Sequence, residues 1–317
     1  MKKKILITGG SGFIGINLIK TLNKTKKYKI VSTYYKSKNF FKVKGVKYFK
    51  VNLENPKQCI KITKGIDIVV MCAANSSGAA IMEKTPLVHL TPNIRMNLNM
   101  LEAAHQRLVK KFIFISSNTV YPLSNRAMRE KDAKFDFFEK YHIVGWMKRF
   151  SEIVCDIYSN KIKKKMTTII VRPGNLYGPH DKFDPQKSKV IPSLIRKVTS
   201  KKKLIEVWGD GKDLKDFLYI QDFCDVLVKI IKNSKKSEIL NIASGKSITI
   251  KEIIHLLLNI ENKKDRKIFY DKSKPSMIPK RMIDISKIKK KYKFSVTTTI
   301  KQGLKNTVNW YKKNNNL

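Results

Sequence analysis

A glycine-rich turn near the N-terminus constrains the fold of this chain more than any other feature. The apolar run 5–7 is followed by Thr8-Gly9-Gly10-Ser11-Gly12-Phe13-Ile14-Gly15, which leads into a helical pattern at 13–24. Glycines between a strand and a helix let the backbone approach a pyrophosphate, whose charge then faces the free N–H groups of the helix N-terminus. A glycine triplet alone is a weak signal, but both flanking segments here have the expected pattern. We therefore predict a dinucleotide site, with a purely structural turn as the alternative.

Length and composition are those of a globular protein. The 317 residues suffice for one large α/β domain or two modest ones, and 42% of them are apolar. The sequence contains no apolar run of about 18 residues, so we expect no membrane span. The basic start Met1–Lys4 precedes too short an apolar stretch for a signal peptide. The four cysteines lie far apart without metal-ligand spacing, which favours free thiols in a reducing cytoplasm and no metal site.

The net charge of +43 raises the question of a nucleic-acid partner. The excess is nearly all lysine and is spread along the whole chain, whereas bidentate phosphate recognition favours arginine. Isoleucine and asparagine are also abundant, which indicates a compositional bias. We therefore expect solvated surface lysines rather than nucleic-acid binding, with attraction of an anionic substrate as the alternative.

Strand and helix patterns alternate through the first half of the chain. Strands are predicted at 3–8, 28–34, 46–50, 66–72, 110–116 and 166–171, and helices at 13–24, 56–63, 87–107 and 139–160. This alternation predicts an α/β fold with a Rossmann-type, doubly wound parallel sheet. Beyond residue 172 the pattern is irregular, with helices near 189–200, 222–232, 249–260 and 299–314. We assign 1–172 to a Rossmann domain, to which segments near 214–245 return, and 173–317 mainly to a smaller substrate-binding lobe.

Three further segments form one set of motifs together with the glycine turn. They are Ile113–Pro122, a strand that ends in Ser116-Ser117; Tyr141 at the start of a long helix; and Arg172–Pro179. With the glycine turn, they resemble the extended short-chain dehydrogenase/reductase family, in particular its nucleotide-sugar epimerases, dehydratases and reductases. The resemblance extends over nearly the whole chain and includes 208–211, 216–222, 280–284 and 310–311. It implies an NAD(P)-dependent enzyme of the cytoplasm that acts on nucleotide-diphosphate sugars in cell-surface polysaccharide synthesis.

Within that family, the segments 116–122, 177–181 and 190–195 resemble GDP-L-fucose synthases. The resemblance implies epimerisation at two carbons beside a sugar ketone, followed by reduction of that ketone with NADPH. However, Thr119 and Lys189 stand where those enzymes have a cysteine and a histidine. A threonine hydroxyl is a far poorer proton donor and acceptor than a thiol, and lysine acts as a base only when its pKa falls. We therefore expect simpler hydride chemistry at the sugar, with GDP-L-fucose synthase proper as the alternative.

Hydride transfer at a sugar carbon requires proton movement at its oxygen. A phenol does this when a neighbouring cation lowers its pKa from about 10, while a hydroxyl holds the sugar oxygen. Tyr141 is the predicted acid/base and Ser117 the predicted hydroxyl, with an ordinary helix tyrosine and a strand-end cap as structural alternatives. The family pattern Tyr-x-x-x-Lys ends here in Gly145. Lys148, ~10 Å from Tyr141 along the helix, is the nearest substitute, or else a solvated helix lysine.

The resemblance also implies a set of substrate contacts. Asn175 and Lys215 would face the diphosphate, with Arg281 as an alternative phosphate partner, and Trp208 would lie at the base pocket. The helix that covers the base would contribute Val190, Leu194 and Lys197, with Lys189 just before it. Surface charge or core packing is the structural alternative for each residue.

The residues at the end of the second predicted strand determine whether the cofactor is NAD or NADP. NAD enzymes place an acidic residue there for the ribose hydroxyls, but Val31–Lys38 contains no carboxylate. Lys36 would accommodate a 2′-phosphate, as would Lys38, which favours NADP over NAD. The resemblance places Asn52-Leu53 at the adenine and Ala73-Ala74 beside the nicotinamide.

The predicted helices 87–107 and 139–160 are long and apolar on one face. In the family such a pair often forms a homodimer by four-helix packing, and burial within one subunit is the competing interpretation. A second hypothesis for the whole chain is a catalytically degenerate family member that binds a dinucleotide or RNA. Gly145 and the positive charge motivate that hypothesis.

Overall fold

The computed structural model describes residues 2–37, 39–76, 85, 87–274 and 278–315. Its centre is a seven-stranded parallel sheet in the order β10-β6-β5-β4-β1-β2-β3. The strands of this sheet are β1 (Lys3–Thr8), β2 (Tyr28–Tyr34), β3 (Lys47–Lys50), β4 (Ile68–Met71), β5 (Lys111–Ile115), β6 (Thr167–Pro173) and β10 (Glu238–Ile242). The order confirms the predicted doubly wound, Rossmann-type sheet.

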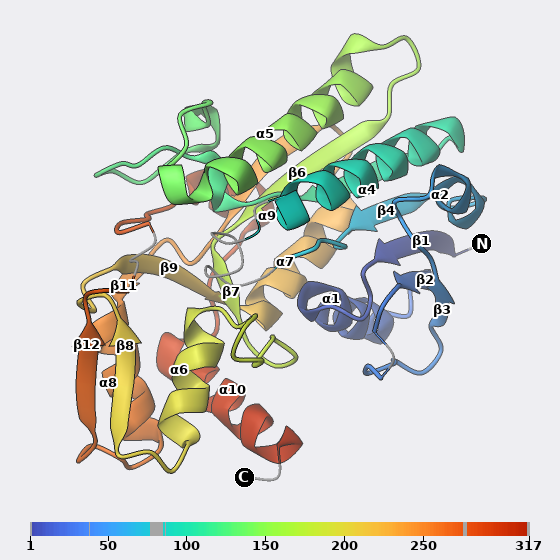
Figure 1. Cartoon of the computed structure of the whole chain (residues 1–317). Helices are drawn as coiled ribbons and strands as arrows, with labels where there is room; N and C mark the ends of the chain where they lie inside the picture. The colour runs from blue at the N-terminus through green and yellow to red at the C-terminus, as the bar shows by residue number, and fades with distance from the viewer. Residues whose placement is uncertain (1, 38, 77–84, 86, 275–277, 316–317) are drawn as a thin grey trace.

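Helices cover both faces of this sheet (Figure 1). One face carries α1 (Phe13–Lys24), α7 (Ile220–Asn233) and α9 (Ser286–Tyr292), and the other carries α2 (Pro56–Ile62), α4 (Leu87–Gln106) and α5 (His142–Asp156). Alternate residues of β1 divide between the two cores, because Ile5 and Ile7 pack with α1 whereas Leu6 packs with α4. The sheet is therefore buried on both faces, as parallel sheets are. No helix in the described part of the chain is long and apolar enough to cross a membrane.

The strand order reverses between β1 and β4, which defines the ligand-binding crevice of an open α/β sheet. Thr8 and Met71 are register partners at the carboxyl ends of these two strands. The hydroxyl of Thr8 accepts the N–H groups of Cys72 and Ala73, each at 3.1 Å. The glycine turn after β1 and the segment after β4 are thereby fixed against each other.

The second half of the chain builds a smaller lobe, drawn below α5 in Figure 1. Its three-stranded sheet contains β7 (Asn175–Tyr177), β9 (Leu214–Tyr219) and β11 (Ser247–Thr249), and β8 (Leu204–Trp208) pairs with β12 (Lys267–Asp271). Its helices are α6 (Val190–Thr199), α8 (Ile250–Ile260) and α10 (Ile300–Asn314), which share a third apolar core. Of the segment 214–245, α7 and β10 lie with the large sheet and β9 lies in the smaller lobe. The boundary at residue 172 stays a prediction.

Two differences from the predicted elements concern the site. The predicted helix 139–160 consists of a 3-10 turn at Glu139–Tyr141, then α5, then a π-helical turn at Ile157–Lys161. The prediction also contains none of the strands β7 to β12. Those strands are only three to six residues long, so an alternating pattern has too few positions to show.

Candidate functional site

The turn between β1 and α1 has the shape of an anion cradle. Gly9 has φ +66°, and a Cβ there would lie 2.7 Å from the Cα of Ala73. A Cβ on Gly15 would lie 2.3 Å from the carbonyl oxygen of Gly9. α1 begins after Gly12 with no side-chain cap and no acidic residue in its first turn. Its first N–H groups therefore stay available for a pyrophosphate, so the cradle fits a dinucleotide.

The side chains that follow this cradle pack into the protein. Phe13 and Ile14 are the first two residues of α1 and pack, partly buried, against the core. They therefore offer their backbone N–H groups, and not their side chains, to a ligand. Ala73 touches the cradle, and Ala74 beside it is exposed at the carboxyl end of β4.

The predicted adenine side lies at the ends of β2 and β3. Lys36 is exposed after β2, with its Nζ 5.8 Å from the ring centroid of Tyr35, and Lys38 lies outside the described residues. The hydroxyls of Ser37 and Ser11 are 3.1 Å apart, which ties this segment to the glycine turn. After β3, Leu53 is buried in the core, whereas Asn52 accepts the N–H of Glu54 through its side chain.

A pair of hydroxyl groups follows β5 at the same edge of the sheet. Ser117 Oγ accepts the backbone N–H of Thr119 at 3.1 Å and the Thr119 hydroxyl at 2.9 Å. Asn118 donates its amide to the carbonyl of Pro173 at 3.2 Å, which fixes the turn to the end of β6. Thr119 is 8% exposed, whereas Ser117 is half-buried. Ser117 is therefore the hydroxyl that a ligand reaches.

Lys148 lies beneath the carboxyl ends of β4 and β5. Its ammonium donates to the carbonyl of Ile115 at 2.8 Å and lies 4.9 Å from the ring centroid of Phe114. Burial lowers the pKa of Lys148 to about 8, although Glu152 and Cys72 act in the opposite direction. A solvated helix lysine, the structural alternative, is therefore wrong.

Tyr141 has different surroundings. It immediately precedes α5 instead of lying within the helix. Burial raises the pKa of Tyr141 to about 12, and the positive charge of Arg281 acts against this rise. The pKa is thus raised instead of lowered, which corrects our expectation, and the cation that acts on the phenol is Arg281.

Gly145 is a point of close packing. A Cβ at this position would lie 2.8 Å from both the Phe137 ring and the carbonyl oxygen of Thr119. A lysine at position 145, as in the family pattern, therefore does not fit without displacement of the neighbouring turn. The same contact brings α5 against the turn that holds Ser117.

Two cations lie on the side of the smaller lobe. Arg281 is only 2% exposed and donates to the carbonyls of Pro122 at 2.8 Å and Tyr121 at 3.1 Å. Its Nε has no hydrogen-bond partner among the described residues, and burial lowers the pKa of Arg281 to about 10. Lys215 pairs with Asp213 at 2.9 Å. A buried guanidinium that is bonded only to neutral carbonyls favours an anionic ligand.

The residues predicted on α6 differ in their exposure. Lys189 is exposed just before the helix, and Val190 at its start is partly buried. Leu194 is buried in the third core, so it supports the helix from within. Lys197 donates to the carbonyl of Glu206 at 2.8 Å, which ties α6 to β8.

The two remaining predicted residues lie on strands of the smaller lobe. Asn175 donates its side-chain amide to the carbonyl of Asp216 at 3.0 Å, between β7 and β9. Trp208 is 43% exposed at the end of β8, and its indole N–H donates to Glu206 at 3.0 Å. An exposed indole ring suits the predicted base pocket, whereas the Asn175 amide is already hydrogen-bonded within the protein.

The prediction missed a turn that spans the two lobes. Asn17 of α1 donates to the carbonyl of Pro179 at 2.9 Å, and Lys182 donates to the carbonyl of Ser76 at 2.8 Å. Between them, Asp181 is buried, and one of its carboxylate oxygens lacks a partner among the described residues. The sequence signal is weak, because loop residues carry no periodicity.

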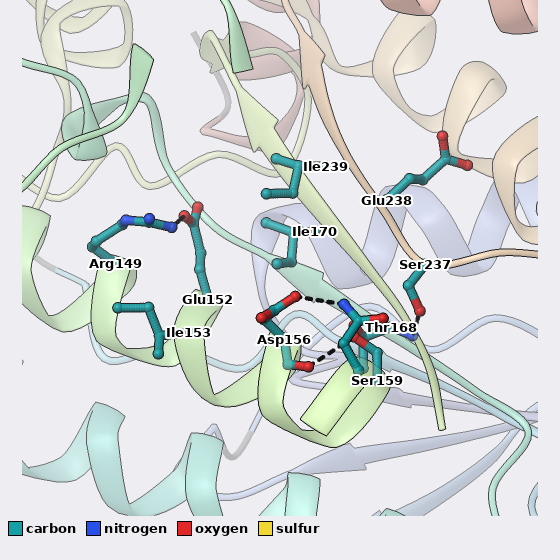
Figure 2. Close-up of a pocket in the computed structure, with 11 residues that line it drawn as sticks. Arg149, Glu152, Ile153, Asp156, Ser159, Thr168, Ile170, Ser237, Glu238 and Ile239 are labelled. Carbon is teal, nitrogen blue, oxygen red and sulfur yellow. Dashed lines mark hydrogen bonds and ion pairs between the residues drawn. The ribbon is translucent and has the colours of Figure 1, made fainter. Parts of the chain in front are cut away.

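A cavity of about 350 Å³ lies away from these residues, between α5, β6 and β10 (Figure 2). On its wall, Glu152 pairs with Arg149 at 3.2 Å and with the buried Arg172 at 2.6 Å. None of the predicted site residues lines this cavity, so it is separate from the candidate site. In the described part of the chain the cysteines are free, and no group of His, Cys, Asp and Glu is arranged to hold a metal ion.

Comparison with known proteins identifies the family. The chain belongs to the NAD dependent epimerase/dehydratase family, which it matches over residues 5–243. It is 25% identical to a dTDP-4-dehydro-6-deoxy-D-allose reductase of a Streptomyces species, over 98% of this chain and 96% of that protein. It is 28% identical to a GDP-L-fucose synthase of Sinorhizobium fredii, over 90% and 88%. In fold, it resembles the UDP-glucose 4-epimerase of Thermus thermophilus, solved with NAD, at a TM-score of 0.85 and 19% identity, over 98% and 99%.

Proposed function

We propose that this protein is an NAD(P)-dependent enzyme that acts on a nucleotide-diphosphate sugar by hydride transfer at the sugar. One observation carries the proposal: the glycine cradle, Ser117 and Lys148 lie along the carboxyl edge of β1, β4 and β5, at the reversal of strand order. The dTDP-sugar reductase and the GDP-L-fucose synthase among its relatives support the substrate class.

Each part of the site has a role in this proposal. When bound, the nicotinamide supplies or accepts the hydride. The turn Gly9–Gly15 holds the pyrophosphate, and Lys148 keeps N–H groups for the ribose hydroxyls beyond the one that binds Ile115. Ser117 donates a hydrogen bond to the sugar oxygen, and Tyr141, which its raised pKa keeps protonated, gives its proton to that oxygen when the ketone is reduced. Arg281 binds the diphosphate of the substrate, with Lys215 as its neighbour.

We propose NADP in preference to NAD, although both belong to the chemistry of the family. The segment after β2 has an exposed lysine, Lys36, and no carboxylate for the ribose hydroxyls. Among the described residues the Lys36 ammonium contacts the Tyr35 ring, which leaves its N–H groups for a 2′-phosphate. A basic loop next to the glycine turn supports this choice.

The acid and base groups around the bound sugar determine which reaction the enzyme catalyses. Reduction or 4-epimerisation needs only the hydride and a proton at one oxygen, which the proposed residues supply. GDP-L-fucose synthase proper also needs acid and base groups for two carbons, and here Thr119 and Lys189 occupy those positions. Because Thr119 donates its hydroxyl to Ser117, it is already engaged. We therefore propose reduction or 4-epimerisation in the cytoplasm, in the synthesis of cell-surface sugars.

Turnover with two substrate pairs tests the proposal. The purified protein is incubated with GDP-4-keto-6-deoxymannose and NADPH, and separately with UDP-glucose and NAD, and the products are identified by mass spectrometry and NMR. We expect consumption of one pair, and no deuterium incorporation from solvent at carbons 3 and 5. Deuterium at both carbons would establish the two-carbon epimerase instead. Failure to bind either dinucleotide would refute the enzyme assignment.

A further inference from the structure

The hydroxyl pair after β5 carries an inference that rests on the proposed function and deepens it. Ser117 Oγ accepts two hydrogen bonds, from the N–H and from the hydroxyl of Thr119. A serine oxygen has two lone pairs, so both are occupied. The hydrogen of the Ser117 hydroxyl finds no acceptor in the described part of the protein, and it is left for a ligand.

The burial of the two residues shows which hydroxyl donates its hydrogen to the other and which donates outward. Two adjacent hydroxyls share one hydrogen between them and keep one to donate outward. Thr119 is buried, whereas Ser117 is half-buried, so the outward donor is Ser117. A hydroxyl that accepts two hydrogen bonds is also polarised into a better donor.

The turn that carries the pair is held rigidly. Asn118 is bonded to the end of β6, and the carbonyl oxygen of Thr119 packs against Gly145 of α5. Because Gly145 has no side chain, the helix approaches this carbonyl closely. The glycine at the family's lysine position therefore fixes the position of Thr119.

We infer that Thr119 is a positioning residue, which orients the Ser117 hydroxyl toward the reacting oxygen of the sugar. Ser117 touches the substrate, whereas Thr119 acts only through Ser117. This gives a role to a threonine that stands at the position of a catalytic cysteine in GDP-L-fucose synthases. Preorganised donors of this kind stabilise the charge that develops on an oxygen during hydride transfer.

A double-mutant cycle tests the inference with whichever of the two substrate pairs the wild type consumes. Ser117→Ala should lower kcat about 100-fold, as loss of one such donor does. Thr119→Val removes the hydroxyl without a change of shape, and it should lower kcat about 10-fold while KM is unchanged. Thr119→Ser, the matched control, should stay within about 3-fold of wild type, because it keeps the hydroxyl.

The decisive comparison is Thr119→Val in the Ser117→Ala background. We expect no further loss of kcat there, because Thr119 has no Ser117 hydroxyl to orient. An equal fold loss in both backgrounds would show a merely structural role and overturn the inference, as would wild-type kcat in Thr119→Val. A wild type that consumes neither pair overturns the proposed function itself, which separates the two failures.

Discussion

Lys148 is a cation that the fold holds in a partly buried position at the edge of the sheet. Its ammonium is bonded to the carbonyl of Ile115 and lies against the Phe114 ring. The position four residues before Lys148 is Val144, and the position four residues after Tyr141 is Gly145. Lys148 therefore does not occupy the family's lysine position, and the assignment of Tyr141 and Lys148 as a catalytic pair stays a prediction, with Arg281 acting on the phenol and Glu152 on the ammonium.

The depressed pKa of Lys148 predicts a pH-dependent contribution to stability. The folded pKa is about 8, below the ordinary lysine pKa of 10.5, so the unfolded chain binds more protons between these values. The wild type should therefore gain stability relative to Lys148→Met as the pH rises from about 8 to 10, by up to about 3 kcal/mol. Thermal melts across this range measure the gain. The control is Lys64→Met at an exposed lysine, and a flat difference for Lys148→Met would contradict the prediction.

A second prediction at the residue scale concerns the contribution of Arg281 to nucleotide binding. Because its buried guanidinium is bonded only to neutral carbonyls, an anionic ligand gains from its charge. Arg281→Gln should weaken binding of GDP and UDP at least about 10-fold, whereas Arg281→Lys should lose less, since the charge remains. Calorimetric titration measures both, with melting temperatures as a check on folding. Unchanged nucleotide affinity in Arg281→Gln would remove Arg281 from the diphosphate site.

At the scale of elements, the contact between α5 and the turn after β5 decides the sign of one substitution. In an open helix, Gly→Ala stabilises by about 1 kcal/mol. Here a Cβ at Gly145 meets the Phe137 ring and a backbone carbonyl at 2.8 Å. Gly145→Ala should therefore destabilise the protein, by about 1–3 kcal/mol, as overpacking does. Denaturant unfolding gives the value.

The ring of Phe137 provides the control for that prediction. Phe137→Ala removes one of the two obstacles, so Gly145→Ala should cost less in that background than in the wild type. An equal cost in both backgrounds would place the strain at the Thr119 carbonyl alone. A stabilised Gly145→Ala protein would contradict the close packing of α5.

The secondary-structure elements and the site residues differ in how well they can be predicted from the sequence. β1 to β6 and α1 are predictable because apolar residues repeat with clear periods along them. Lys148 is hard to place because helix geometry gives its distance from Tyr141 but not the direction of the chain before α5. Tyr141 ends the 3-10 turn at Glu139–Tyr141, just before the helix α5 that carries Lys148. The partners of Arg281 come from a distant segment, 121–122, which local patterns do not encode.

At the scale of the whole molecule, the helices α4 and α5 lie side by side on one face of the sheet (Figure 1). Trp146 on α5 is 40% exposed and stacks on Phe150, with ring centroids 5.4 Å apart, and Leu87 of α4 is also exposed. Exposed apolar side chains on a helix pair favour association. This supports the proposed homodimer.

Light scattering after size exclusion tests the dimer. We expect a mass of twice the 36.7 kDa of one chain, and a shift toward one chain for Trp146→Glu. Thr307→Ser on α10, distant in the sequence, is a control that should leave the mass unchanged. A wild type of one-chain mass at all concentrations would contradict the homodimer.

Dinucleotide binding at the glycine cradle tests the central claim most directly. NADPH and NADH are titrated by calorimetry into the wild type, Gly9→Ala and Gly45→Ala. Both glycines have positive φ, but a Cβ at Gly9 lies 2.7 Å from Ala73, whereas none of the described atoms lies within 4 Å of one at Gly45. We predict binding by the wild type and Gly45→Ala, and at least about 10-fold weaker binding by Gly9→Ala. Equal affinity in all three proteins, or no binding by the wild type, would contradict the account.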